Sequence, residues 1–150
     1  MKLASNRNMK ARRNAGFSLV ELMVAVAIVA LLSMIAVPSF MQNVRKSKRV
    51  DAQTALTRTS YNLERFMASN GRYTTNPTLL GLIVDDDGVW SDERNYTIRV
   101  TAGPSGITRG YVITATAATG GMQEDDTGCT VLALDSLGQR TPDPATSKCW

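Results

Sequence analysis

The sequence has no histidine among its 150 residues and only two cysteines. The lack of an imidazole excludes histidine-based acid–base catalysis and the commonest kind of metal ligation. We also find no glycine-rich nucleotide loop, no cluster of metal ligands and no nucleophile beside a base. Ser18 lies near Glu21, but no base accompanies the pair. The chain is therefore not expected to be an enzyme or to hold a cofactor or a metal.

Acidic residues are missing from the first sixteen positions, which carry five basic residues instead. These are Lys2, Arg7, Lys10, Arg12 and Arg13. They account for the formal net charge of +4, because the remainder has 12 Lys and Arg against 13 Asp and Glu. A short basic segment ahead of an apolar run is typical of targeting segments, which are set aside in fold reasoning. The basic pI of about 9.3 is therefore no indication of nucleic-acid binding.

Charge is also missing from Leu22 to Val37, a run of sixteen residues. Together with residues 17–21 the run has 21 residues, close to the ~20 that a helix needs to cross a bilayer. The positive charge before it predicts that residues 1–16 stay cytoplasmic and that the remainder is exported. An ordinary secretory signal is cleaved at small residues after its apolar region, and no comparable site follows Val37.

Glu21 is the one charged residue inside this apolar stretch. A carboxylate there costs about 2.5–3.5 kcal/mol on insertion scales, so a partner is expected. If the chain were cut after Gly16, the new amine of Phe17 would lie four residues before Glu21, on the same helix face. A neighbouring subunit would supply such an amine equally well. The alternative is an ordinary signal peptide or anchor that tolerates Glu21 near its edge.

The stretch Gly16-Phe17-Ser18-Leu19-Val20-Glu21-Leu22-Met23, with its basic leader and apolar helix, closely resembles the class III signal of type IV pilins. The resemblance implies that a membrane prepilin peptidase cuts after Gly16 and methylates Phe17. It also implies that the helix 17–37 is first anchored in membrane lipid and later lies in a filament core. Glu21 would then neutralise the Phe17 amine of a neighbouring subunit during docking.

Residues 38–70 predict the amphipathic half of the same long helix, with a kink at Pro38. Asn70-Gly71 is expected to end it. The basic cluster, residues 45–49, is either a solvated or lipid-contacting segment or a charge contact between subunits. The apolar stripe expected to be buried consists of Phe40, Val44, Ala52, Ala55, Leu56, Leu63, Phe66 and Met67.

The head, residues 71–150, begins with an irregular segment up to Arg94. Its run Asp85-Asp86-Asp87 lacks the alternate spacing of a calcium loop and is interpreted as a solvated turn. Alternating apolar residues then predict an antiparallel meander packed on the helix stripe. The expected strands are 96–100, 111–116, 129–134 and a short one at 138–141. Because Cys129 and Cys149 lie in the exported part, we expect one disulfide that ties down the tail 141–150.

The overall expectation is an α+β, type IV pilin-like fold with a long N-terminal helix packed on a small antiparallel sheet. Residues 63–66, 70–73, 136–138 and 149–150 are most similar to minor pilins of the PilE type. What the resemblance implies is a structural minor pilin that supports pilus assembly and pilus-dependent adhesion, twitching motility or DNA uptake. The implied partners are other pilin subunits, the prepilin peptidase, the inner-membrane assembly machinery and membrane lipid.

Two alternatives stay open, a pseudopilin of a type II secretion system and a DNA-binding competence pilin. DNA is possible but not favoured, because residues 71–150 carry six basic residues against ten acidic ones. Arg99 and Arg109 flank one turn, however, and Tyr96 and Tyr111 lie near enough in sequence to offer stacking. The expected localisation is the bacterial inner membrane, with the head in the periplasm, and then a surface pilus.

Overall fold

The computed structural model describes residues 17–86 and 88–150. The predicted leader 1–16, with Gly16, and one residue of the aspartate run, Asp87, lie outside the described residues. The chain divides into two compact units, one ending at Ser39 and the other comprising Phe40–Trp150. The long helix α1 (Leu19–Asn70) contributes to both units, which are described separately below.

Helix α1 continues through Pro38 and ends at Asn70. The residue after it, Gly71, has a φ of 69°, and its amide donates to the carbonyl oxygen of Met67. Glycine takes up this left-handed conformation without a steric penalty, so the predicted end of the helix is confirmed. The kink at Pro38 stays a prediction.

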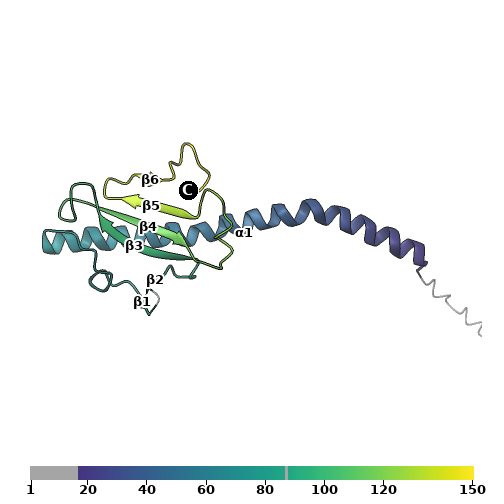
Figure 1. The fold of residues 1–150 in the computed structure, drawn as a ribbon, viewed down its shortest axis with the longest axis horizontal. Coiled ribbons are helices and arrows are strands. Elements are labelled where there is room, and N and C mark those ends of the chain that lie inside the picture. Colours follow the sequence, from purple (N-terminus) through teal and green to yellow (C-terminus); the bar gives the residue numbers. More distant parts are fainter. Residues whose placement is uncertain (1–16, 87) are drawn as a thin grey trace, which may run out of the picture. The chain divides into compact units, whose positions relative to one another are not determined.

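The head contains a four-stranded antiparallel sheet in the order β3-β4-β5-β6, which lies over α1 in Figure 1. Its strands are β3 (Tyr96–Ala102), β4 (Tyr111–Ala117), β5 (Val131–Asp135) and β6 (Arg140–Thr141). The predicted meander and the α+β class with a long N-terminal helix are confirmed. The third strand starts two residues later than expected, because Cys129 belongs to the preceding turn.

The core lies between the inner face of this sheet and the middle of α1. From the helix come Ala52, Ala55, Leu56 and Leu63, and from the sheet Tyr96, Ile98, Tyr111, Ile113, Ala115 and Leu132. The prediction for Phe40 was wrong, since its side chain is 67% exposed. The spacing of apolar residues identifies which face of a helix is buried. A residue on that face is buried only where the sheet covers its turn of the helix, and the buried residues of α1 begin only at Asp51.

The segment between α1 and β3 is more ordered than the sequence predicted. It contains a short 3₁₀ turn, η1 (Thr78–Leu80), and a small hairpin of β1 (Val84–Asp85) and β2 (Gly88–Val89). Leu80 is buried and anchors the segment to the core. Asp86 is exposed in the hairpin turn, and Asp85 forms an ion pair with Arg94.

Candidate functional site

The segment Phe17–Val37 exposes all of its large apolar side chains in the isolated chain. Its most apolar 18-residue window has a mean hydropathy of 2.7, and none of that window is buried. The helix is long and apolar enough to cross a membrane. A helix that is apolar on all sides needs lipid or other helices around it, and the described part of the chain supplies neither for this unit.

Glu21 lies in the first turn of α1 with its side chain exposed. An acid at this place is favoured by the partial positive charge of the helix N-terminus. Among residues 17–86 and 88–150, no basic side chain forms an ion pair with it. Its predicted partnership with the amine of Phe17 stays a prediction, because the peptide bond at Gly16 lies outside the described residues.

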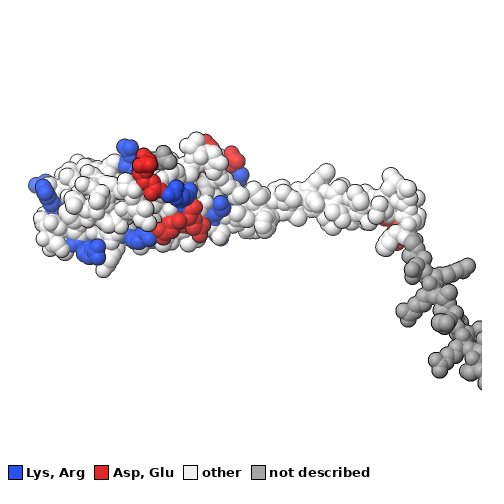
Figure 2. All heavy atoms as spheres, turned by 90° about the horizontal axis from the view of Figure 1, so that it is seen from below, with Lys and Arg blue, Asp and Glu red and all other residues white. Residues whose placement is uncertain are grey.

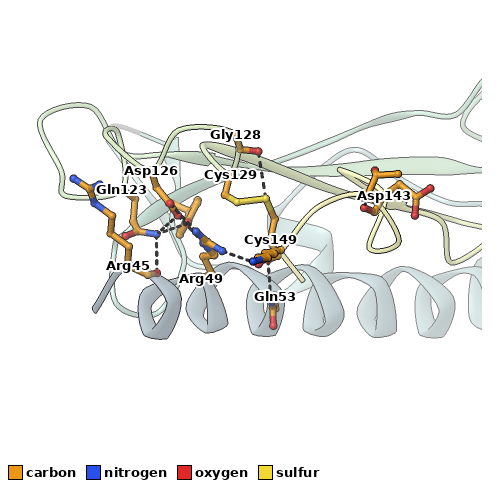
Figure 3. Close-up of a disulfide and its surroundings, with 12 residues drawn as sticks. Arg45, Arg49, Gln53, Gln123, Asp126, Gly128, Cys129, Asp143 and Cys149 are labelled. Atoms are coloured by element: carbon orange, nitrogen blue, oxygen red, sulfur yellow. Dashed lines mark hydrogen bonds and ion pairs between the residues drawn. A yellow bond between two sulfur atoms is a disulfide. The ribbon is translucent and has the colours of Figure 1, made fainter. Parts of the chain in front are cut away.

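The basic cluster, residues 45–49, is largely occupied by contacts inside the head. Arg49 donates two 2.7 Å hydrogen bonds to the carboxylate of Asp126 and a third to the carbonyl oxygen of Lys148 (Figure 3). Arg45 forms an ion pair with Asp125, and Lys48 donates to Asn95. The sequence did not predict these contacts within the head, and its interpretations of the cluster, a solvated or lipid-contacting segment or a charge contact between subunits, stay predictions for the exposed Lys46.

The pair Arg49–Asp126 is nearly buried, with side chains 15% and 6% exposed. The hydrogen bonding that Arg49 donates to Asp126 raises the pKa of the Arg49 guanidinium, and burial opposes that shift. Gln123 completes the cluster by donating to the hydroxyl oxygen of Tyr96 at 2.7 Å. These contacts fasten the turn 123–126 to α1, so the cluster has a structural role within the head.

Asp51 is a second buried anchor that the sequence did not predict. Its carboxylate accepts hydrogen bonds from the hydroxyl of Ser91 at 2.7 Å and from the side-chain amide of Asn95 at 3.1 Å. The backbone amide of Glu93 donates to it as well. One signal in the sequence was available, because Asp51 directly precedes Ala52, a residue of the predicted buried stripe. A carboxylate buried there must accept hydrogen bonds, so donors from the head could have been expected beside it.

A third polar cluster fastens the end of α1 to the sheet. The hydroxyls of Tyr73 and Tyr111 both donate to the carboxylate of Glu64, and the rings meet edge to face at 4.9 Å. Ser60 shares a 2.8 Å hydrogen bond with Tyr111. Burial raises the pKa of Tyr111 to about 12, and burial followed by the bond to Glu64 raises the pKa of Tyr73.

The predicted disulfide joins Cys129 to Cys149 (Figure 3). Both residues are buried, and the side-chain amide of Gln53 donates to the backbone carbonyl of Cys149. The C-terminal segment is therefore held both by a covalent bond to the turn before β5 and by hydrogen bonds to α1. Arg140 lies over the ring of Trp150 at 5.1 Å, which adds a cation–π contact.

The face of the sheet that points away from α1 carries mostly threonines. Register places Thr97 beside Thr116, Arg99 beside Thr114 and Thr101 beside Val112. Arg99 is exposed here, whereas Tyr96 and Tyr111 are buried on the opposite face. Tyr96 and Tyr111 are therefore not placed to stack on a ligand beside Arg99, a possibility that their nearness in the sequence had left open.

Basic and acidic residues are mixed over the head rather than separated. On the face in Figure 2, blue and red residues adjoin one another on the head, whereas the apolar part of α1 is almost free of both. No group of three or more His, Cys, Asp or Glu able to hold a metal occurs in the part of the chain that the structure describes. The most unusual surface of this chain is thus its exposed apolar helix.

Comparison with known proteins places these features in a class. Residues 11–37 match the prokaryotic N-terminal methylation motif, the motif of type IV pilins. Residues 38–133 match the family model described as type IV minor pilin ComP, DNA uptake sequence receptor. That match covers more than half of the chain, which therefore belongs to this family of type IV minor pilins, and the resemblance to type IV pilins is confirmed.

Several characterised proteins are similar over part of their length. The type II secretion system core protein G of Dickeya chrysanthemi is 32% identical over 85 residues, covering 57% of this chain and 56% of that protein. The core protein G of Aeromonas hydrophila is 30% identical over 59% of this chain and 62% of its own length. The type IV major pilin protein PilA of Myxococcus xanthus is 39% identical over 62 residues, 41% of this chain and 28% of that protein.

The matched regions thus span less than two thirds of these relatives. Among solved structures, a type IV pilin from Shewanella oneidensis superposes with a TM-score of 0.49 and 24% identity, covering 71% of this chain and 97% of that one.

Proposed function

We propose that the protein is a structural subunit of a type IV pilus, a minor pilin without catalytic activity. The observation that carries the proposal is the apolar helix Phe17–Val37, all of whose large apolar side chains are exposed in the isolated chain. Exposed apolar surface of this extent marks a site of contact with lipid or with other proteins. Lipid covers it before assembly, and the equivalent helices of other pilin subunits cover it in the filament.

Processing between Gly16 and Phe17 follows from the same proposal. The match of residues 11–37 to the N-terminal methylation motif supports cleavage there by a prepilin peptidase and methylation of Phe17. Glu21 then meets the amine of a neighbouring Phe17 within the apolar bundle. A charge without a partner is costly inside an apolar bundle. The pair of the Glu21 carboxylate and the Phe17 amine therefore fixes the position of each incoming subunit along the filament axis.

The head lies in the periplasm, and the chain crosses the inner membrane once before the assembly machinery extracts it into a surface pilus. The basic residues before the apolar run support this orientation. The disulfide Cys129–Cys149 supports it independently, because structural disulfides persist in oxidising compartments such as the periplasm.

Cell fractionation tests this proposal. An epitope-tagged full-length chain should occur in the inner membrane and in filaments sheared from the surface, and a strain lacking the prepilin peptidase should keep it in the membrane only. A chain recovered solely from the cytoplasm, or equally present in sheared material without the peptidase, would contradict the proposal.

A pseudopilin is the second candidate, supported by the 30–32% identity to the core protein G of two bacteria. A minor pilin and a pseudopilin share the processing step and the apolar helix. They differ in the machinery that assembles them, a pilus assembly system or a type II secretion system. Deleting the pilus assembly system should remove the chain from the cell surface, whereas deleting a type II secretion system should leave it there. The opposite pattern would favour the pseudopilin.

A DNA receptor is the third candidate, supported by the description of the family that matches residues 38–133. Against it stand the acidic balance of residues 71–150 and the burial of Tyr96 and Tyr111. We expect the full-length chain in detergent to bind duplex DNA weakly and without sequence preference at physiological salt. A dissociation constant below about 1 µM with a steep salt dependence, lost in Arg99→Ala and Arg109→Ala, would make the DNA receptor the first candidate.

A further inference from the structure

An amine, a carboxamide and a buried carboxylate lie in contact between α1 and the residue before β3. The amine is that of Lys48, whose Nζ donates to the side-chain oxygen Oδ1 of Asn95 at 3.0 Å. On its other side the amide nitrogen Nδ2 of Asn95 donates to Oδ2 of Asp51 at 3.1 Å. A lysine amine is a nucleophile, and a carboxylate is a carrier of protons. The cluster therefore holds the groups needed to exchange one amide bond for another.

The side-chain amide of Asn95 is held in one orientation by its neighbours. Its nitrogen Nδ2 donates to Oε2 of Glu93 at 3.1 Å as well as to Asp51, so two carboxylates face this nitrogen. The carbonyl oxygen Oδ1 is the atom that contacts Lys48. The carbon Cγ is bonded directly to Oδ1, which places the lysine nitrogen close to the separation of about 3–3.5 Å from which reacting atoms combine.

Asp51 is suited to carry protons between the two nitrogens. The residue is 8% exposed, and its carboxylate is fixed by the hydroxyl of Ser91 at 2.7 Å and the backbone amide of Glu93 at 3.2 Å. Charge interactions of a buried carboxylate are stronger than those in water. Once Nζ of Lys48 is bonded to Cγ, both nitrogens are attached to the same carbon. A carboxylate oxygen that contacts the leaving nitrogen is then within reach of the attacking one.

We propose that Lys48 and Asn95 form an intramolecular isopeptide bond with loss of ammonia. Nζ attacks Cγ, and the electron pair of the carbonyl bond moves onto Oδ1. Two protons pass from the lysine ammonium through Asp51 to the leaving nitrogen. The carbonyl bond then re-forms, the bond between Cγ and Nδ2 breaks, and the nitrogen leaves as ammonium. No oxidant, reductant or further reactant is consumed, and the reaction occurs once in each chain without turnover of a substrate.

The bond fastens α1 covalently to the start of the sheet. The disulfide Cys129–Cys149 joins the turn before β5 to the C-terminal segment and does not include α1. The new bond closes a loop over residues 48–95, which contain the end of α1, η1 and the hairpin of β1 and β2. A pulling force that enters the head along α1 passes directly into β3, so this loop cannot be extended. The inference goes beyond the proposed function, because the reaction requires a folded head and no filament.

The full-length chain, purified from cells in detergent and reduced, tests the proposal by mass spectrometry. Its intact mass should be lower than that of its unreacted sequence by one ammonia molecule. A tryptic digest should contain one branched peptide in which residues 47–49 are joined to residues 95–99, because Lys and Arg residues flank both segments. On a denaturing gel the reduced chain should migrate faster than an unreacted variant, since the loop cannot extend.

Three variants isolate the groups involved. Lys48→Arg keeps a positive charge and a hydrogen-bond donor but lacks the reactive amine, so it should have the full mass. The matched change Lys46→Arg should still lose ammonia. Asp51→Asn should slow the reaction at least about a hundredfold, the smaller effect expected for loss of a proton carrier, when the reacted fraction of pulse-labelled chain is followed with time. Urea denaturation measures whether each variant is folded.

The possible results separate the bond from other causes. A folded chain of full mass without the branched peptide would overturn the proposal and leave the filament function intact. Loss of ammonia that persists in Lys48→Arg would also overturn it, because Asn70-Gly71 can release ammonia by forming a succinimide without a lysine. A folded Asp51→Asn that reacts as fast as the unchanged chain would overturn the role of Asp51. If Asp51→Asn unfolds, the mass of Lys48→Arg still decides whether the bond forms.

Discussion

The apolar residues of α1 have different surroundings in the two units of the chain. Between Phe17 and Val37 the large ones are all exposed, whereas in the head Leu56 and Leu63 are completely buried against the sheet. The charged residues of α1 differ between the two units in the same way, by whether the chain itself supplies their contacts. Glu21 forms no ion pair with a described residue, whereas Arg49, Asp51 and Glu64 each contact the sheet or its loops. One unit is therefore complete in itself, and the other requires partners from outside the chain.

The difference has a consequence for mutations. A substitution in the head acts on the free energy of unfolding, because its contacts are made within the chain. A substitution in the apolar unit acts on assembly and leaves the stability of the head unchanged. The predictions below separate these two kinds of effect.

The largest effect is expected for Glu21→Val. Leaving one charge of a buried pair without its partner costs about 3–5 kcal/mol, so the amount of chain in sheared filaments should fall at least about a hundredfold. Cleavage, membrane insertion and the unfolding of the head should be unchanged, which immunoblotting and urea denaturation would measure. The matched change Met23→Leu should assemble normally. Normal assembly of Glu21→Val would remove the role proposed for this residue.

Arg49→Met should have an effect of comparable size on the free energy of unfolding of the head, and not on assembly. The change leaves Asp126 buried without its cation, which should lower the free energy of unfolding by about 3–5 kcal/mol. The nearby exposed Lys46→Met should change it by less than about 0.5 kcal/mol. Urea denaturation of the detergent-solubilised chain, followed by tryptophan fluorescence, would measure both. The double variant Arg49→Met/Asp126→Leu should recover much of the loss, and a double variant no more stable than Arg49→Met would contradict the pairing.

Loss of the disulfide should cost slightly less. Cys129 and Cys149 are 20 residues apart, and closing a loop of that length stabilises by roughly 3 kcal/mol on the chain-entropy model. Cys129→Ala/Cys149→Ala should lower the free energy of unfolding by that amount and become insensitive to reductant. Thiol labelling of the native periplasmic protein should detect no free cysteine. Two reactive thiols there would show that the bond does not form in the cell.

The smallest effect concerns Tyr111 at alkaline pH. Its pKa is about 12 in the folded chain and about 10 when unfolded, so folding favours the protonated hydroxyl. This contribution is fully present below pH 10 and is lost as the pH rises from about 10 to 12, by roughly 2 kcal/mol. Tyr111→Phe should be less stable at pH 8, because Ser60 and Glu64 lose a partner, and should lose less stability between pH 9 and 11.5. Equal alkaline losses in the two proteins would contradict this.

Much of the fold could be predicted from local patterns in the sequence. The 3.6-residue stripe from Ala52 to Leu63 and the alternation in residues 96–100 and 111–116 report burial on one face, which is what defines these elements. Asn70-Gly71 identified the helix end for a steric reason. The small hairpin of β1 and β2 was not predictable in this way, because two-residue strands have no period.

The polar clusters were harder to predict than the apolar core. Arg49 and Asp126 are 77 residues apart, and no local pattern relates them. The basic cluster at 45–49 therefore resembled a free surface, although two of its arginines pair with the turn at 125–126. Phe40 was misplaced for the related reason that the reach of the sheet along α1 depends on tertiary structure.

The most direct test of the account is the intact mass of this chain recovered from sheared surface filaments. The account predicts a chain that begins at N-methylated Phe17, with Cys129 and Cys149 joined, since only an apolar helix freed of its leader can pack among other subunits. A chain that still begins at Met1, one cut beyond Val37, or the absence of the chain from filaments would contradict it.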